Sequence, residues 1–264
     1  MNKIELHGIQ KSFGDQVVLK HIDLTVQEGE TLVVIGRSGC GKSVMLKHIV
    51  GLYKPDKGSV YVDGEDITGL KEYELFSIRR KFGFLFQGSA LLDSLTVGEN
   101  VGLGLVELTS HPPAVIQSIT SEKLAMVGMT GIEDYMPSDL SGGMKKRVGL
   151  ARAIVMEPQI VLYDEPTTGL DPIMADSINE LIIALKKELK ITSVVVTHDM
   201  TSARKVGDRI AMLHDGEIIF IGTVPELEVA ENPIVRQFVE GRAEGPIKPM
   251  FKRLIPDQEK MNLT

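Results

Sequence analysis

A glycine-rich segment, GRSGCGKS, constrains the fold of this chain more than any other feature. It occupies residues 36–43 and fits the pattern G-x-x-x-x-G-K-[ST]. An apolar run, residues 31–35, precedes it, and a segment that we expect to be helical, from Ser43 to about Val50, follows it. In this context the glycines let backbone N–H groups turn toward phosphates, and the helix N-terminus adds a positive dipole. The segment therefore predicts a phosphate-binding loop between a buried strand and a helix.

The residues of this 36–43 loop have separate predicted roles. Lys42 would reach the β- and γ-phosphates of a nucleotide, and the Ser43 hydroxyl would bind Mg²⁺. Cys40 is interpreted as a small, tolerated residue rather than a catalytic group. The other predicted nucleotide contacts are Gly36, Arg37, Ser38, Gly39, Gly41 and Val44. A chance match to the pattern is the alternative, and the strand and helix around it argue against chance.

Composition and charge narrow the class of protein. The 264 residues allow one large domain or two small ones, and 36 acidic residues against 29 lysines and arginines argue against nucleic acid as the main partner. The single cysteine excludes a disulfide framework and suits a reducing compartment. We find no apolar run near the ~20 residues that span a bilayer and no export signal. We therefore expect a soluble cytoplasmic protein whose membrane role would come through a partner.

The hydrophobic pattern predicts an α/β fold. Apolar residues alternate with polar ones in the first 30 residues, which indicates antiparallel strands. Residues 160–163 and 193–197 look like fully buried parallel strands, with an amphipathic helix between them. Residues 88–157 have turn and helical character, which predicts a mainly helical insertion. Residues 208–223 predict a closing hairpin, and the polar, proline-bearing residues 241–264 predict an extended tail.

Two acidic residues end one of these predicted strands. Asp164 can hold Mg²⁺, usually through water, and Glu165 could act as a general base on the attacking water. Solvated acids at an ordinary strand end are the alternative. His198 follows the next apolar strand and could hydrogen-bond the γ-phosphate, although a lone histidine at a strand end is usually structural.

A second glycine-containing segment, LSGG, precedes a predicted helix. Ser141 can cap this helix, and Gly142 and Gly143 leave its first N–H groups open to an anion. Alone, the segment would be an ordinary helix start. It continues MKKR at residues 144–147, where many importers have glutamines, and we expect this change to affect mainly the helix surface.

Taken in order, these motifs resemble the ATP-binding-cassette (ABC) ATPases. The order is the 36–43 loop, Gln87, residues 141–143, the Asp164–Glu165 pair, the GLD at residues 169–171, and His198, and the match covers roughly residues 3–223. The resemblance implies an α/β nucleotide-binding domain over residues 1–240. It would combine a P-loop core with a mixed sheet, an N-terminal antiparallel β subdomain and an inserted helical subdomain at about 88–157. Residues 241–264 would follow as the tail.

The same resemblance implies composite sites in a dimer. Two ATP molecules would lie between two copies of the chain, each held by the 36–43 loop of one copy and residues 141–143 of the other. Gln87 would sense Mg²⁺ and water, so Ser43, Gln87 and Asp164 form the implied metal set. Asp171 would communicate across the dimer. Phe13 occupies the place of the aromatic residue that stacks on adenine, and a core role is the alternative.

Shorter matches suggest a narrower group. Residues 84–92, 144–147, 171–173 and 235–241 look like the ATPases of Mla/Mce-type phospholipid-transport systems. That resemblance implies an integral-membrane, MlaE-like permease dimer, an MCE-domain lipid-binding protein and, in some systems, a STAS-domain regulator. The chain would then act at the cytoplasmic face of a bacterial inner membrane. Leu91, Leu92 and Leu95 are candidates for permease docking, with internal packing as the alternative.

Other functions remain open at this level. An importer ATPase for a polar solute, such as an amino acid, would carry the same nucleotide motifs. A soluble ABC ATPase of the iron–sulfur assembly type fits the size of the chain. A nucleotide-dependent regulator with little turnover is a third possibility, and Glu165 and His198 argue against it. The tail could contact the second ATPase or another partner, or it could be disordered.

Overall fold

The computed structural model describes residues 1–248, which fall into two compact units. The first is Met1–Val224, and the second begins at Pro225. In the second unit, α8 (Val224–Glu228) starts at the boundary and α9 (Pro233–Glu240) follows. Residues 241–248 form turns and bends, and the amide of Gln237 exchanges hydrogen bonds with the backbone of Ile247. The rest of the predicted tail, residues 249–264, lies outside the described residues.

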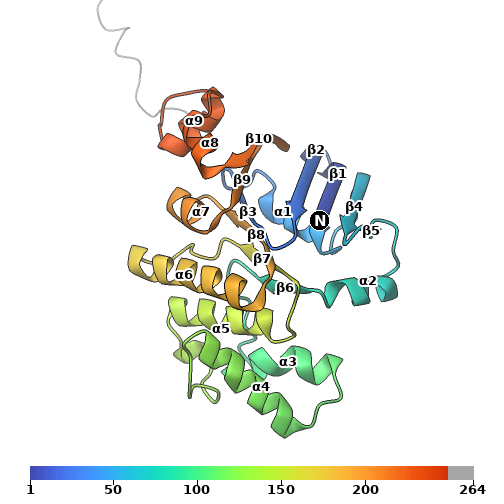
Figure 1. Cartoon of the computed structure of the whole chain (residues 1–264), viewed down its shortest axis with the longest axis vertical. Helices are drawn as coiled ribbons and strands as arrows, with labels where there is room; N and C mark the ends of the chain where they lie inside the picture. Colours follow the sequence, from blue (N-terminus) through green and yellow to red (C-terminus); the bar gives the residue numbers. More distant parts are fainter. Residues whose placement is uncertain (249–264) are drawn as a thin grey trace, which may run out of the picture. The chain divides into compact units, whose positions relative to one another are not determined.

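The first unit is built on one mixed sheet (Figure 1). Its strands are β1 (Asn2–Phe13), β2 (Gln16–Gln27), β3 (Thr31–Ile35), β4 (Lys57–Val62), β5 (Glu65–Asp66), β6 (Phe82–Leu85), β7 (Ile160–Asp164), β8 (Thr192–Thr197), β9 (Arg209–His214) and β10 (Glu217–Thr223). Across the described residues the strand order is β5-β4-β1-β2-β10-β9-β3-β8-β7-β6. The predicted α/β class with a mixed sheet is confirmed.

One half of the sheet is antiparallel and the other is parallel. β1 pairs with β2 and β4 in the antiparallel sense, with Ile4 opposite Val26 and Leu6 opposite Leu24, so the alternating apolar residues share one buried face. β9, β3, β8, β7 and β6 run parallel to one another, whereas β9 and β10 form an antiparallel pair. β3, β7 and β8 are buried along their whole length, which explains why apolar residues fill their centres.

The two halves share a hydrophobic core around α1 (Lys42–Ile49). Met45, Leu46 and Ile49 of this helix are fully buried and belong to the same cluster as apolar residues of β1, β2, β3, β7 and β8. The helix begins at Lys42, within the last two residues of the 36–43 loop and one residue earlier than the sequence predicted. Packing of α1 on both halves of the sheet therefore fixes where the loop lies.

The predicted helical region contains α3 (Val97–Leu108), α4 (Pro113–Met126) and α5 (Gly142–Ile154), with a 3₁₀ turn at Pro137–Asp139. The three helices pack against one another, and α5 also packs against β6. That contact is close, because a Cβ on Gly83 of β6 would lie 2.1 Å from the carbonyl oxygen of Ala153. Movement of α5 is therefore coupled to β6 and to the segment that follows it.

The remaining helices of the first unit are α2 (Glu72–Arg79), α6 (Pro172–Leu189) and α7 (Met200–Val206). α6 packs against α5 and α7, and α7 packs against β3 and β8. Asp171 caps α6 and Asp199 caps α7, each by accepting two backbone N–H groups. Among residues 1–248, no helix combines the length and apolar character that crossing a bilayer requires.

Candidate active site

Four neighbouring parallel strands place the predicted catalytic residues at one edge of the sheet. β3, β8, β7 and β6 are adjacent in that order and share one direction. Their carboxyl ends lead into Gly36, His198, Glu165 and Gln87 respectively. Ligands of open α/β sheets bind at such an edge, where loops after the strands converge. The topology thus brings together residues that are up to about 160 positions apart in the sequence.

Two glycines of the 36–43 loop, Gly36 and Gly41, are required by close packing as well as by backbone conformation. Gly36 has φ 155°, and a Cβ there would lie 2.3 Å from the carbonyl oxygen of Leu213. Gly41, the N-cap of α1, has φ 105°, and a Cβ there would lie 2.9 Å from Leu19. No side chain caps the first turn of α1. The first N–H groups of the helix, together with its dipole, are therefore suited to an anion.

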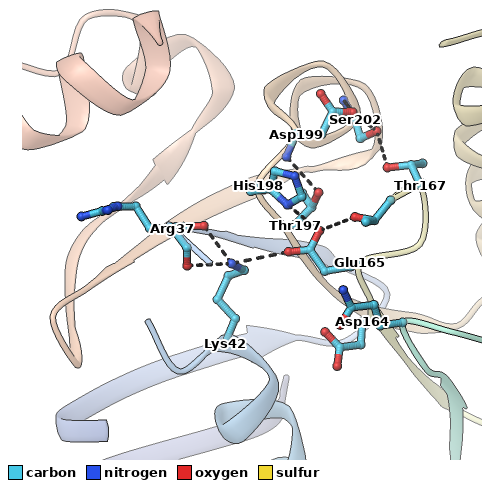
Figure 2. A network of polar contacts seen from close by, with 12 residues as sticks. Arg37, Lys42, Asp164, Glu165, Thr167, Thr197, His198, Asp199 and Ser202 are labelled. Atoms are coloured by element: carbon cyan, nitrogen blue, oxygen red, sulfur yellow. Dashed lines mark hydrogen bonds and ion pairs between the residues drawn. The ribbon is translucent and has the colours of Figure 1, made fainter. Parts of the chain in front are cut away.

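Lys42 is buried beneath this loop and connects it to β7. Its ammonium donates hydrogen bonds to the carbonyl oxygens of Gly36, at 2.8 Å, and Arg37, at 3.1 Å. The same nitrogen lies 3.5 Å from Oε1 of Glu165 (Figure 2). A cation held at this depth, between the loop and an acidic residue, can neutralise phosphate charge inside the loop.

Ser43 and Asp164 form the pair that the sequence predicts for Mg²⁺. The Ser43 hydroxyl donates to Oδ1 of Asp164 at 2.8 Å, so the first turn of α1 meets the end of β7. Burial raises the pKa of Asp164, while the Ser43 hydrogen bond acts in the opposite direction. A hydroxyl and a largely buried carboxylate are hard oxygen donors, which is the chemistry that Mg²⁺ selects. The residues present therefore fit the ion.

Glu165 follows Asp164, but the two side chains point in different directions (Figure 2). Its φ is 51°, a left-handed conformation that costs a residue with a side chain on the order of 1 kcal/mol or more. Its N–H donates to the carbonyl oxygen of Val196 at 2.9 Å. Its Oε2 accepts from the Thr168 hydroxyl at 3.0 Å. The unusual backbone angle turns the carboxylate away from Asp164 and toward the pocket.

His198 contacts this same carboxylate. Its Nδ1 lies 2.9 Å from Oε2 of Glu165, and its side chain is 48% exposed. The structure therefore pairs His198 with the predicted base, a contact that the sequence did not indicate. Behind it, Thr197 accepts from the N–H of Asp199, and Asp199 accepts from the Ser202 hydroxyl, so the turn that carries His198 is fixed by hydrogen bonds (Figure 2).

A pocket of about 290 Å³ lies in front of the loop. Phe13, which is 43% exposed, lies on its wall, so the alternative that Phe13 is a core residue is wrong. The Phe13 ring meets Tyr53 edge-on with centroids 5.5 Å apart. The pocket thus joins an aromatic face to the phosphate-binding loop. Its lining residues are Phe13, Val18, Ser38, Gly39, Gly41, Lys42, Ser43, Val44, Gln87 and Glu165.

Ser141, Gly142, Gly143 and Asp171 are predicted site residues that do not line this pocket. Ser141 caps α5 by accepting the N–H of Met144 at 3.3 Å. A Cβ on Gly143 would lie 2.5 Å from Met174 of α6, and a Cβ on Gly142 would lie 3.7 Å from Leu170. These residues therefore gather where α5 and α6 begin, as a second surface of the same unit.

Lys146 corrects one expectation from the sequence. The MKKR change was expected to affect mainly the helix surface, but Lys146 is only 5% exposed. The signal was present, because Lys146 lies three residues after Gly143 and four before Leu150, on the buried face of α5. Thr168 was also missed, since a hydroxyl in a loop gives no periodic signal.

The chain matches the family model described as "ABC transporter" over residues 19–168. It is 43% identical over 244 residues to "Probable ribonucleotide transport ATP-binding protein mkl" of Mycobacterium tuberculosis, covering 92% of this chain and 68% of that protein. It is 37% identical over 246 residues to "Intermembrane phospholipid transport system ATP-binding protein MlaF" of Escherichia coli, covering 93% and 91%. A solved structure, the dimeric post-hydrolysis state of the ATP-binding cassette MJ0796 bound to ADP and Pi, superposes with a TM-score of 0.77 at 37% identity, covering 84% of this chain and 98% of that one.

Proposed function

Since the chain belongs to the ABC transporter family and is an ABC-type ATPase, we propose that it drives a phospholipid-transport complex of the Mla/Mce type. The observation that carries the proposal is the match to MlaF, which spans more than nine-tenths of both chains at 37% identity. The mkl relative is more similar in sequence, but a third of it lies outside the match. Its name also gives a different cargo, ribonucleotides, which the experiment below must distinguish.

Hydrolysis is assigned to the residues at the sheet edge. The 36–43 loop and Lys42 would bind the phosphates, and Phe13 would stack on the base. Ser43 and Asp164, with Gln87, would hold Mg²⁺, which would supply charge neutralisation to the phosphates. Glu165 would act as general base on water, and His198, 2.9 Å away, would orient the Glu165 carboxylate and meet the γ-phosphate.

The positions of the pocket in front of the 36–43 loop and of the group formed by residues 141–143 and Asp171 support a dimeric active form. Residues 141–143 lie at the start of α5, Asp171 lies at the start of α6, and none of them lines the pocket. This is the arrangement expected if a second copy brings its own set to the nucleotide. The MJ0796 relative is described as a dimer in the ADP- and Pi-bound state. We propose that this chain forms the same kind of pair, with two composite ATP sites.

A groove between α3 and α4 supports a permease partner. It encloses about 610 Å³ and combines apolar side chains, including Leu95, Val106 and Ile116, with the acidic Glu133 and Asp134. We propose that cytoplasmic segments of a membrane-spanning permease bind here. Of the three leucines predicted for docking, Leu95 lines the groove, whereas Leu91 and Leu92 do not. The chain would thereby act at the cytoplasmic face of a bacterial inner membrane.

The experiment is purification of the tagged full chain from membranes in mild detergent, with identification of the proteins and lipids that accompany it. We expect a permease, an MCE-domain protein and phospholipid, and in some systems a STAS-domain regulator. A permease with a soluble solute-binding protein and no lipid would assign the chain to uptake of a polar solute or ribonucleotide. Recovery without any membrane protein would overturn the transport proposal and favour a soluble ABC ATPase.

A further inference from the structure

Helix α5 reaches the catalytic edge of the sheet through a buried lysine. Lys146 lies on the inner face of α5 and is 5% exposed. Its ammonium donates to the carbonyl oxygen of Gln87 and, at 3.1 Å, to the carbonyl oxygen of Glu165. One side chain therefore connects the helix to the segments that follow both β6 and β7. Neither acceptor is a carboxylate, so these contacts hold main chain rather than form an ordinary ion pair.

The main chain that Lys146 holds has an unfavourable conformation. Glu165 adopts φ 51°, and such an angle persists only where the surroundings impose it. Three contacts do so: the Glu165 N–H donates to Val196, and the Glu165 carbonyl oxygen accepts from the N–H of Thr168, at 3.3 Å, and from Lys146. Loss of the Lys146 contact would let this peptide rotate and carry the carboxylate away from His198.

A second basic residue of α5 holds the segment after Gln87. Arg152 donates to the carbonyl oxygens of Ser89, at 2.5 Å, and Ala90, at 2.8 Å. Ser89 and Ala90 also have positive φ values, 62° and 48°. Lys146 and Arg152 of α5 therefore both hydrogen-bond the strained turn at residues 87–90. Of these two residues, Lys146 also contacts Glu165.

Burial of an ammonium has a cost that the surroundings partly offset. Desolvation lowers the pKa of Lys146, and the nearby charges of Asp164 and Glu165 act against that shift. A methionine of similar volume would remove the desolvation cost, so packing alone does not require lysine here. What lysine supplies, and an apolar side chain does not, is a set of donors for the two carbonyl oxygens.

We propose that Lys146 is a positioning residue that fixes the main chain of Gln87 and of the general base Glu165 relative to α5. The inference rests on the proposed function, because residues 141–143, at the start of this helix, would meet the nucleotide bound by the second copy. Lys146 lies about 8 Å along the helix from Ser141. When residues 141–143 bind the nucleotide held by the second copy, any movement of α5 is therefore transmitted through Lys146 to Glu165 of the same chain.

The test compares Lys146→Met with Lys145→Met in the full chain purified with its permease. Lys145 is the neighbouring lysine, is partly exposed, and serves as the matched control. We expect Lys146→Met to lower kcat at least tenfold with KM for ATP within twofold of the native value. Lys145→Met should leave both within twofold, and Lys146→Arg, which keeps the donors, should retain at least a third of native kcat.

A double-mutant cycle separates positioning from a general structural role. In a Glu165→Gln background the base is already absent, so adding Lys146→Met should change the residual kcat less than twofold. An equal loss in both backgrounds, or a kcat within twofold of native for Lys146→Met alone, would overturn the assignment. If the methionine variant does not fold, Lys146→Gln replaces it, because its shorter side chain does not span both carbonyl oxygens. A native kcat for Lys146→Gln would then overturn the proposal.

The two proposals fail in different ways. The proposed function is tested by the ATPase rate of the native chain and by the proteins and lipids that copurify with it. The ratio of variant to native kcat reports on Lys146, whatever the transported cargo.

Discussion

Nδ1 of His198 lies 2.9 Å from Oε2 of Glu165, and this contact joins the ends of two adjacent parallel strands. When Glu165 is ionised its oxygen can only accept, so Nδ1 must carry the proton. Nε2 is then the atom left to meet a phosphate, and it can donate to phosphate only from the imidazolium form. The pair therefore orients the proposed base and leaves Nε2 for the proposed contact with the nucleotide.

Replacement of this histidine should impair chemistry rather than binding. We expect His198→Ala to lower kcat on the order of 100-fold, a typical contribution of a group that assists acid–base chemistry, with little change in ATP affinity. His7→Ala is a suitable control, because the His7 side chain is similarly exposed and lies on β1. ATPase assays and nucleotide binding would measure the two effects separately. A native kcat for His198→Ala would contradict the assigned role.

Asp164 should show a pH-dependent stability cost. Its pKa in the folded chain is raised above 3.8 by burial, so at neutral pH ionisation is less favourable in the folded state than in the unfolded state. The nucleotide-free Asp164→Asn variant should therefore unfold at a higher temperature than the native chain at pH 7.5. The difference should shrink as the pH falls through the raised pKa toward 3.8, where native Asp164 becomes neutral.

The same variant should lose metal affinity even though its fold is more stable. We expect the Mg²⁺ concentration for half-maximal ATPase activity to rise about tenfold or more. Asp15→Asn, an exposed turn residue, should change neither the unfolding temperature nor the Mg²⁺ requirement. A destabilised Asp164→Asn variant at neutral pH would show that the Ser43–Asp164 contact outweighs desolvation.

Phe13 should contribute to base binding through its ring. Because the ring is exposed on the wall of the pocket, Phe13→Ala should raise KM for ATP roughly threefold to tenfold, the value of one aromatic stack, with kcat little changed. Tyr73→Ala, an exposed aromatic residue of α2 away from the pocket, should leave KM unchanged. An unchanged KM for Phe13→Ala would contradict this role.

Gln87 should matter most for communication with the permease. It lines the pocket, and its carbonyl oxygen accepts a hydrogen bond from Lys146 of α5. It therefore connects the pocket to the helical region that carries the proposed docking groove. Gln87→Ala should weaken stimulation of the ATPase by the permease more than it weakens ATP binding. Gln16→Ala, in the β1–β2 hairpin, is the control. Equal losses of stimulation and binding would count against a coupling role.

Local patterns predicted the strands and the residues at their ends, because apolar runs and glycine spacing are encoded within a few positions. The convergence of Gly36, Glu165 and His198 depends on the order of the parallel strands, which the sequence indicated only through its resemblance to the ABC ATPases. The contacts of Lys146 and Thr168 were not predictable in the same way. They depend on which side of a helix or loop faces a segment far away in the sequence, and for Lys146 the charged MKKR segment suggested exposure.

Cys40 offers a chemical probe of loop occupancy. Burial raises the pKa of its thiol, with Lys42 acting in the opposite direction, so little thiolate is present at neutral pH. Alkylation by a maleimide or iodoacetamide should therefore be slower than for a free cysteine and should accelerate as the pH is raised. The thiol lies within the 36–43 loop, and a Cβ on Gly36 would lie only 2.9 Å from its sulfur. A bulky adduct should thus block phosphate binding and ATPase activity, and ATP should protect. Cys40→Ala should remain active and resist the reagent; inhibition that persists in this variant would place the sensitive group elsewhere.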